Sequence, residues 1–230
     1  MNDMLPRLLR TLRPAASASM PEPAPSPAPV RPAPRLPPHL LANARMLPNR
    51  LDVLPLLPKS GVVVEVGVAL GGFSEHLIRE CEPGHFIAID TFQLHDLPLF
   101  WGQPRSHWFG ELTHGEFYRR RFEAVIRAGK ASVIERDSTV ALQGLADGSV
   151  DILYLDADHS YDSVARELSV IKRKMKPGGT LIMNDYIMAD AGGPYGVIQA
   201  TNEFMVAENW EMIYFALEPN MYCDAVLRKL

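Results

Sequence analysis

The segment that most constrains the fold is a short apolar run followed by a glycine-rich turn and a helical pattern. The β-branched run Val62–Val66 has the composition of a buried strand and ends at Gly67. Gly67, Gly71 and Gly72 let the backbone turn tightly, and helical spacing continues over Gly71–Glu80. A strand that enters a helix through such a turn predicts an α/β unit in which a ligand can approach the backbone closely.

The alternation of strand and helix continues along the chain. Further strands are expected at His85–Asp90, Ala131–Arg136, Val150–Leu155 and Thr180–Met183. Helices are expected at Phe117–Ala128, Thr139–Leu145, Asp162–Met175 and Val197–Glu208, and Pro177-Gly178-Gly179 stops the third of these. Alternating strands and helices predict a parallel sheet that is covered on both faces.

The last two expected strands, Met212–Leu217 and Ala225–Leu227, are joined by only a few residues. So short a link permits only an antiparallel pair, because parallel strands need a long crossover. The predicted fold class is therefore α/β, a Rossmann-like, mostly parallel seven-stranded sheet with a C-terminal antiparallel strand pair and helices on both faces.

Proline sets the expected boundary of this domain. Residues 14–38 contain ten of the twenty prolines, mixed with Ala and Ser. Proline lacks the backbone donor and has a fixed φ, so this stretch cannot form a helix interior or a central strand, and it has too few large apolar residues to offset its ordering entropy. We expect residues 1–50 to be a disordered Pro/Ala/Arg-rich tail and linker, and residues 51–230 to be one domain.

Charge changes at the same boundary. Seven arginines against Asp3 and Glu22 give residues 1–50 a charge of +5; since the whole chain has a net charge of −4, residues 51–230 carry −9. An acidic domain argues against a nucleic-acid partner, because phosphate binding needs clustered Lys and Arg, and it favours a small-molecule acceptor. The two cysteines imply no disulfide framework and favour a cytoplasmic location, and no apolar run is long enough to span a membrane.

The glycine turn differs from two phosphate-binding motifs. A dinucleotide fingerprint needs glycine two residues after the first, where this chain has Ala69. A P-loop needs lysine after its last glycine, where this chain has Phe73 and Ser74. The turn therefore fits a ligand that needs close approach but has no phosphate, and S-adenosylmethionine meets that description.

Two carboxylates are expected at neighbouring strand ends. Asp156 closes one strand and Asp185 closes the next, so both side chains should emerge at the carboxyl edge of the sheet. Two adjacent carboxylates repel unless a cation neutralises them, and Mg²⁺ or another hard divalent metal prefers oxygen ligands. His159 can reach the same cleft and act as a base, whereas Asp158 is expected to cap the following helix.

The pattern Glu65-x-Gly67-x-x-x-Gly71 resembles the first motif of class I S-adenosylmethionine-dependent methyltransferases. The resemblance implies the Rossmann-like methyltransferase fold, a donor whose amino-acid half lies along Gly67–Phe73 with Glu65 near its ammonium, and an adenine near Asp137 and Ser138. Asp90 ends the second strand, where a carboxylate can accept hydrogen bonds from ribose hydroxyls. The expected cofactor-binding residues are Glu65, Gly67, Val68, Ala69, Gly71, Gly72, Phe73, Asp90, Thr91, Asp137, Ser138 and Asp156.

Three later segments resemble one branch of that class, the metal-dependent small-molecule O-methyltransferases of the macrocin and catechol types. These segments are Asp156-Ala-Asp-His159-Ser-Tyr161, Lys176-Pro-Gly-Gly179 and Asn184-Asp185-Tyr186. The resemblance implies that Asp156 and Asp185 hold a divalent metal and that His159 is the catalytic base. Asn184 should point to the opposite face of its strand from Asp185, which puts a third ligand from this segment in doubt.

A long aromatic-rich connection, residues 92–118, is the expected substrate lid. The alternative use of its aromatic side chains is packing against the domain or a second copy of the chain, so a homo-oligomer stays open. The competing function is a non-catalytic cofactor-binding or scaffold module that acts through the Pro-rich tail. A nicotinamide-dependent oxidoreductase is disfavoured by Ala69 and by the terminal antiparallel pair.

Overall fold

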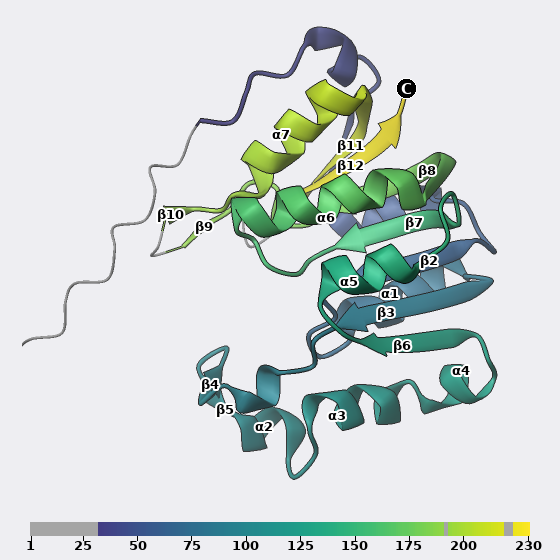
Figure 1. Cartoon of the computed structure of the whole chain (residues 1–230), viewed down its shortest axis with the longest axis vertical. Coiled ribbons are helices and arrows are strands. Elements are labelled where there is room, and N and C mark those ends of the chain that lie inside the picture. The colour runs from purple at the N-terminus through teal and green to yellow at the C-terminus, as the bar shows by residue number, and fades with distance from the viewer. Residues whose placement is uncertain (1–31, 191–192, 219–222) are drawn as a thin grey trace, which may run out of the picture.

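A computed structural model describes residues 32–190, 193–218 and 223–230 (Figure 1). Its centre is an eight-stranded sheet in the order β1-β11-β12-β8-β7-β2-β3-β6. The strands are β1 (Arg45–Leu47), β2 (Val62–Val66), β3 (His85–Asp90), β6 (Ala131–Glu135), β7 (Val150–Leu155), β8 (Met175–Met183), β11 (Trp210–Leu217) and β12 (Cys223–Lys229). The predicted α/β class is confirmed, with eight strands in place of seven.

Five neighbouring strands, β6, β3, β2, β7 and β8, pair in parallel. Their carboxyl ends therefore meet at one edge of the sheet. Strand β12 runs antiparallel to both β8 and β11, which confirms the predicted closing pair. The start of β8 differs from the prediction. The strand begins at Met175, directly after the preceding helix, and includes Pro177-Gly178-Gly179, which the sequence indicated as a loop.

Helices cover both faces of this sheet. Those labelled in Figure 1 are α1 (Gly72–Cys81), α2 (Arg105–Phe109), α3 (His114–Arg121), α4 (Glu123–Arg127), α5 (Ser138–Gly144), α6 (Tyr161–Lys174) and α7 (Val197–Glu208). Strand β2 shows why the layers form: Val64 and Val66 pack with α5, α6 and α7 in one core, whereas Val63 packs with α1 in the other. Successive side chains of a strand point to opposite faces, so an almost wholly apolar strand requires a cover on each side.

The N-terminal part of the domain begins earlier than the sequence indicated. Residues 38–56 form η1 (Pro38–Leu41), β1 and η2 (Arg50–Leu56), and β1 pairs in parallel with the edge strand β11. Leu40 and Leu54 are almost fully buried. The expected disorder is therefore wrong for residues 38–50. Strand pairing and the burial of a few leucines stabilise this segment, and these leucines are too widely spaced to form a periodic pattern in the sequence. Residues 1–31, with most of the Pro-rich stretch, lie outside the described part.

The connection between β3 and β6 contains local structure of its own. It includes η3 (Leu94–Asp96), α2, α3 and a small hairpin of β4 (Leu99–Phe100) and β5 (Gln103–Pro104). A second small hairpin, β9 (Ala189–Asp190) with β10 (Gly193–Pro194), follows β8. No helix in the described ranges combines the length and apolar character that crossing a membrane requires.

Candidate active site

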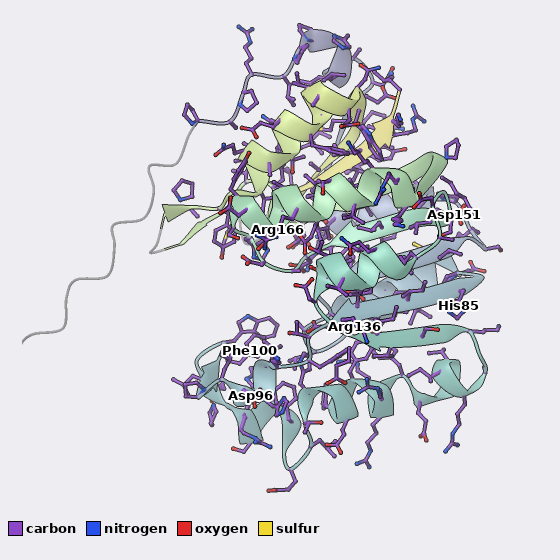
Figure 2. All side chains as sticks on the ribbon, viewed as in Figure 1. His85, Asp96, Phe100, Arg136, Asp151 and Arg166 are labelled. Atoms are coloured by element: carbon purple, nitrogen blue, oxygen red, sulfur yellow. The ribbon has the colours of Figure 1, made fainter. Side chains whose placement is uncertain are left out.

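A cleft of about 810 Å³ opens at the carboxyl ends of the parallel strands. Figure 2 shows Arg166 of α6 on one side of it and Phe100 with Arg136 on the other, and all three line the cleft. Seven of the predicted cofactor-binding residues also line it: Gly67, Ala69, Asp90, Thr91, Asp137, Ser138 and Asp156. Open α/β sheets bind ligands at this edge, and the structure brings these seven residues together along one cleft there.

Contacts within the protein constrain the backbone of the glycine turn. Gly67, Ala69 and Gly71 all have positive φ, at 81°, 42° and 79°. A Cβ on Gly67 would lie 1.9 Å from the carbonyl oxygen of Asp156. His114 of α3, fully buried, contacts the carbonyl oxygen of Ala69 through Nε2 at 2.6 Å. The turn is therefore held between β7 and α3, with Gly67 and Ala69 facing the cleft.

Five predicted cofactor-binding residues lie outside the cleft lining: Glu65, Val68, Gly71, Gly72 and Phe73. Glu65 is buried behind the turn, where it accepts a hydrogen bond from Ser74 Oγ, which in turn accepts one from the Tyr118 hydroxyl at 2.9 Å. Burial raises the pKa of Glu65 well above its ordinary value, against the opposing hydrogen bond from Ser74. Glu65 therefore lies beneath the turn and does not itself line the cleft.

Asp90 is oriented toward the cleft by two backbone amides. Its Oδ2 accepts a hydrogen bond from Val68 N at 2.9 Å, and its Oδ1 accepts one from Phe92 N at 2.7 Å. Each carboxylate oxygen has a second lone pair. Asp90 is thus fixed in direction while it keeps acceptor capacity for ligand hydroxyls.

Asp137 and Ser138 lie at the start of α5. Asp137 caps this helix, because its Oδ1 accepts a hydrogen bond from Val140 N at 3.0 Å. Ser138 Oγ donates to Glu167 Oε1 at 2.5 Å. Glu167 itself lines the cleft with 1 % of its surface exposed, and burial raises its pKa to about 7. The end of the cleft expected to hold adenine thus contains a buried carboxyl that the sequence did not indicate.

Asp156, His159 and Asp185 come together at the ends of β7 and β8. His159 Nε2 lies 3.4 Å from Asp156 Oδ1 and 3.3 Å from Asp185 Oδ2. Burial raises the pKa of Asp156 and, together with the Asp156 charge, raises that of Asp185 to about 6. Burial lowers the pKa of His159, but the neighbouring carboxylates outweigh it and raise that pKa overall.

This cluster has the donor set of a divalent metal site. One ligand atom from each of the three residues lies within 4.8 Å of the others. His159 Nε2 is buried and has no hydrogen bond of good geometry, although it faces two carboxylates. The carboxylates of Asp156 and Asp185 fit a bound cation, and the unsatisfied Nε2 of His159 beside them keeps its lone pair for a proton.

Asn184 lies beside the cluster and lines the cleft. It is buried, and its side-chain amide donates to Asp224 Oδ1 at 3.0 Å. The expected capping of α6 by Asp158 is wrong, although its carboxylate accepts hydrogen bonds from Ser160 N and Ser163 Oγ, each at 2.8 Å. Ser160 is the N-cap residue itself.

Two further cleft residues were missed by sequence reasoning as site residues. Tyr195 stacks on the His159 imidazole, with ring centroids 4.7 Å apart. Arg50, at the start of η2, lines the cleft from a segment that was assigned to the linker. Asn49, which caps η2 by accepting from Leu51 N at 2.8 Å, was a sequence signal for a helix start at that position.

Some aromatic residues of the connection between β3 and β6 line the cleft, and others are buried in the core. Phe100 and Trp101 line the cleft, and Trp108 Nε1 donates to the Phe100 carbonyl oxygen at 2.8 Å. Phe92 and Tyr118 are instead buried in the core. Part of the connection therefore borders the cleft, and part of it is ordinary packing.

The sheet order, the reversed strand β12 and the cleft define a Rossmann-like methyltransferase domain. The chain belongs to the family described as a methyltransferase domain, whose model matches residues 64–186. This membership supports S-adenosylmethionine as the methyl donor. Family membership identifies neither the acceptor nor a metal.

Individual relatives are more distant. The chain is 28% identical over 160 residues to a dimethylglycine N-methyltransferase of Parasynechococcus marenigrum, covering 69% of this chain and 49% of the relative, so it spans about half of that protein's length. It shares its fold with a B. subtilis tRNA methyltransferase (TM-score 0.53, 16% identity, 80% of this chain and 67% of the other). A Streptococcus mutans protein assigned as a methyltransferase and solved in complex with SAH gives a TM-score of 0.54 at 12% identity, over 78% and 95% of the chains.

These similarities do not identify the partners of this chain. At such identities the structural likeness concerns the fold alone, so it assigns no nucleic acid to this chain. It also leaves the expected absence of a nucleic-acid partner untested. The acceptor therefore has to be argued from the cleft itself.

Proposed function

We propose that this protein transfers the methyl group of S-adenosylmethionine to a hydroxyl of a small-molecule acceptor, with a divalent metal held by Asp156 and Asp185. The observation that carries the proposal is the placement of His159 Nε2 within 3.4 Å of both carboxylates at the ends of adjacent strands. Mg²⁺ is the expected ion, because it prefers oxygen ligands.

The chemistry divides among three side chains. Asp156 and Asp185 would hold a divalent ion, which would supply Lewis acidity toward an acceptor hydroxyl. His159 removes the hydroxyl proton at Nε2, and Tyr195 holds the imidazole plane by stacking. As the new oxygen–carbon bond forms, the carbon–sulfur bond of the donor breaks, which leaves S-adenosylhomocysteine and a protonated His159.

The aromatic part of the cleft lining points to a flat or glycosidic acceptor. Phe100 stacks on Trp101, with ring centroids 4.2 Å apart, and both line the cleft. Trp101 is 65% exposed. An aromatic surface at the mouth can cover one face of a ring and exclude water from the reacting atoms.

The cluster also favours a hydroxyl over an amine. The dimethylglycine N-methyltransferase is named for a tertiary amine, which has a free electron pair and no proton to lose. A hydroxyl is a poor nucleophile until it loses its proton, so it requires a base. His159, whose Nε2 lies within 3.4 Å of both carboxylates, is the group placed to serve.

Mass spectrometry tests the proposal. The full chain is incubated with S-adenosylmethionine, Mg²⁺ and matched libraries of phenols, sugar-bearing compounds and amines. We expect a mass gain of one methylene on hydroxyl compounds. Methylation confined to amines would overturn the hydroxyl assignment, and cofactor binding without transfer to any compound would favour the non-catalytic scaffold.

A further inference from the structure

Arg50 brings a positive charge to the acidic end of the cleft. Its Nη1 donates to the Tyr154 hydroxyl at 3.2 Å, and its Nε pairs with Glu218 Oε1 at 2.7 Å. The guanidinium carbon lies 4.8 Å from the centre of the Phe73 ring. In the described part of the chain, the remaining terminal nitrogen, Nη2, has no hydrogen-bond partner.

The position of Arg50 is fixed by aromatic residues of the core. Phe73, in the first turn of α1, stacks on Tyr154 of β7 with ring centroids 4.1 Å apart. Tyr154 is fully buried. A guanidinium that rests on one ring and donates to the hydroxyl of the other loses little further freedom when it binds a ligand, because its planar fork is already oriented.

Arg50 is also the arginine that acts on the acidic groups of this end. Burial raises the pKa of both Asp185 and Asp224, and Arg50 opposes the rise in each case. Of the other arginines that line the cleft, Arg166 donates to Ser163 Oγ and acts on Glu167 at the far end. The carboxylates of Asp156 and Asp185 would repel a ligand carboxylate at this end of the cleft, whereas the Arg50 guanidinium would attract it.

We propose that Arg50 binds the α-carboxylate of S-adenosylmethionine through its free Nη2 and so places the amino-acid half of the donor beside the glycine turn. The inference rests on S-adenosylmethionine as the donor and is independent of the metal and the acceptor. The carboxylate is the one anionic group of this donor, whose ammonium and sulfonium suit the surrounding acidic residues. Arg50 lies outside residues 64–186, so this contact is contributed by the N-terminal segment.

Isothermal titration calorimetry tests this role with two ligands. S-Adenosylhomocysteine carries the carboxylate, and its decarboxylated counterpart keeps the adenosine, sulfur and ammonium without it. We expect Arg50→Ala to weaken S-adenosylhomocysteine binding about tenfold or more, as for loss of a charge-assisted hydrogen bond, and to change the decarboxylated ligand by less than about threefold. Arg50→Lys should be intermediate, because it keeps the charge but not the fork.

The controls separate a binding role from a structural one. Arg45→Ala removes an exposed arginine of the same segment and should change neither affinity. Glu218→Gln breaks the ion pair with Arg50 and should leave S-adenosylhomocysteine binding intact or tighter, because a competing carboxylate is lost. If Arg50→Ala lowers the melting temperature strongly, Arg50→Gln takes its place.

Equal weakening of both ligands by Arg50→Ala, or no effect on either, would overturn the inference, as would a loss of binding in Glu218→Gln that matches the Arg50→Ala loss. Failure of the wild-type chain to bind S-adenosylhomocysteine would overturn the donor assignment itself. The two failures are thus distinguishable. Neither measurement depends on the metal or the acceptor.

Discussion

At the residue scale, Gly67 occupies a position that only glycine fits. Its φ of 81° lies in the left-handed region, and a Cβ would lie 1.9 Å from the Asp156 carbonyl oxygen, which is backbone and cannot rotate away. The sequence indicated a tight turn with close ligand approach. The structure adds a reason internal to the protein, because β2 and β7 meet at this residue.

Gly67→Ala is therefore expected to destabilise the protein by roughly 3 kcal/mol or more, since strain and overpacking act together. Gly72→Ala is the matched control, because a Cβ there has no neighbour within 4 Å and the residue starts α1. Urea unfolding measures both variants. Equal stabilities for the two would contradict this explanation of the turn.

Asp185 combines a left-handed backbone, with φ at 50°, and a carboxylate that faces His159 Nε2. Asp and Asn tolerate that conformation better than most residues, so Asp185→Asn should fold while it removes a metal ligand. We expect the affinity for Mn²⁺ to fall at least about tenfold, as measured by calorimetric titration. Asp158→Asn, which alters a carboxylate bonded to Ser160 N and Ser163 Oγ, is the control, and an unchanged affinity in Asp185→Asn would remove that residue from the site.

At the scale of elements, the packing of α5 against α6 encloses Glu167. Burial raises its pKa from the ordinary value to about 7. At neutral pH the folded protein therefore retains a proton that the unfolded chain has released, so this group makes the protein less stable as pH rises. Its contribution is fully present below the unfolded pKa and is lost as pH rises through about 7.

Glu167→Gln, which resembles the neutral carboxyl in shape, should remove this loss. We expect the variant to be more stable than the wild type by roughly 1–3 kcal/mol near pH 8, with a difference that disappears near pH 4. Urea unfolding across this range, without ligands, checks the prediction. The exposed Glu123→Gln should show no such trend, and a pH-independent difference in Glu167→Gln would rule out titration as its cause.

The N-terminal elements η1 and β1 are part of the domain. Leu40 is buried against one core, and β1 covers the free edge of β11. A chain that starts at residue 32 keeps every described contact, whereas one that starts at residue 51 loses these and also Arg50. We expect the first to unfold at the same urea concentration as the full chain and the second at a clearly lower one. Identical midpoints for all three would restore the boundary at residue 51.

The elements that the sequence predicted best are those with strong local signals. Val62–Val66, His85–Asp90 and Val150–Leu155 agree with the structure residue for residue, because β-branched runs bounded by turns have few alternatives. The strand Arg45–Leu47 was missed because its pairing partner lies far along the chain, at Tyr214–Ala216. Contacts at that separation leave no periodic trace in a three-residue strand.

Among the residues of the candidate site, too, those with a strong local signal could be predicted from the sequence. Asp90, Asp156 and Asp185 were predictable because each closes a strand and strand ends converge. Glu65 was placed in the cleft by resemblance, but its burial depends on α1 and α3 packing over it. Arg50 and Glu167 required knowledge of which helices border the cleft, and neither residue carries a motif of its own.

At the scale of the whole molecule, a methyltransferase domain carries an acidic cluster at the point where donor and acceptor should meet. The chain spans about half of its curated relative, so the activity of the whole protein is a proposal built on this cleft. The fold and family support the donor. The coupled set of Asp156, His159 and Asp185 supports metal assistance.

The most direct test is methyl transfer to a hydroxyl acceptor before and after exhaustive chelation, followed by stepwise return of Mg²⁺. The account predicts that chelation removes nearly all transfer, that Mg²⁺ or Mn²⁺ restores it, and that S-adenosylhomocysteine still binds the chelated protein. Full transfer by the metal-free protein would contradict the proposed role of Asp156 and Asp185.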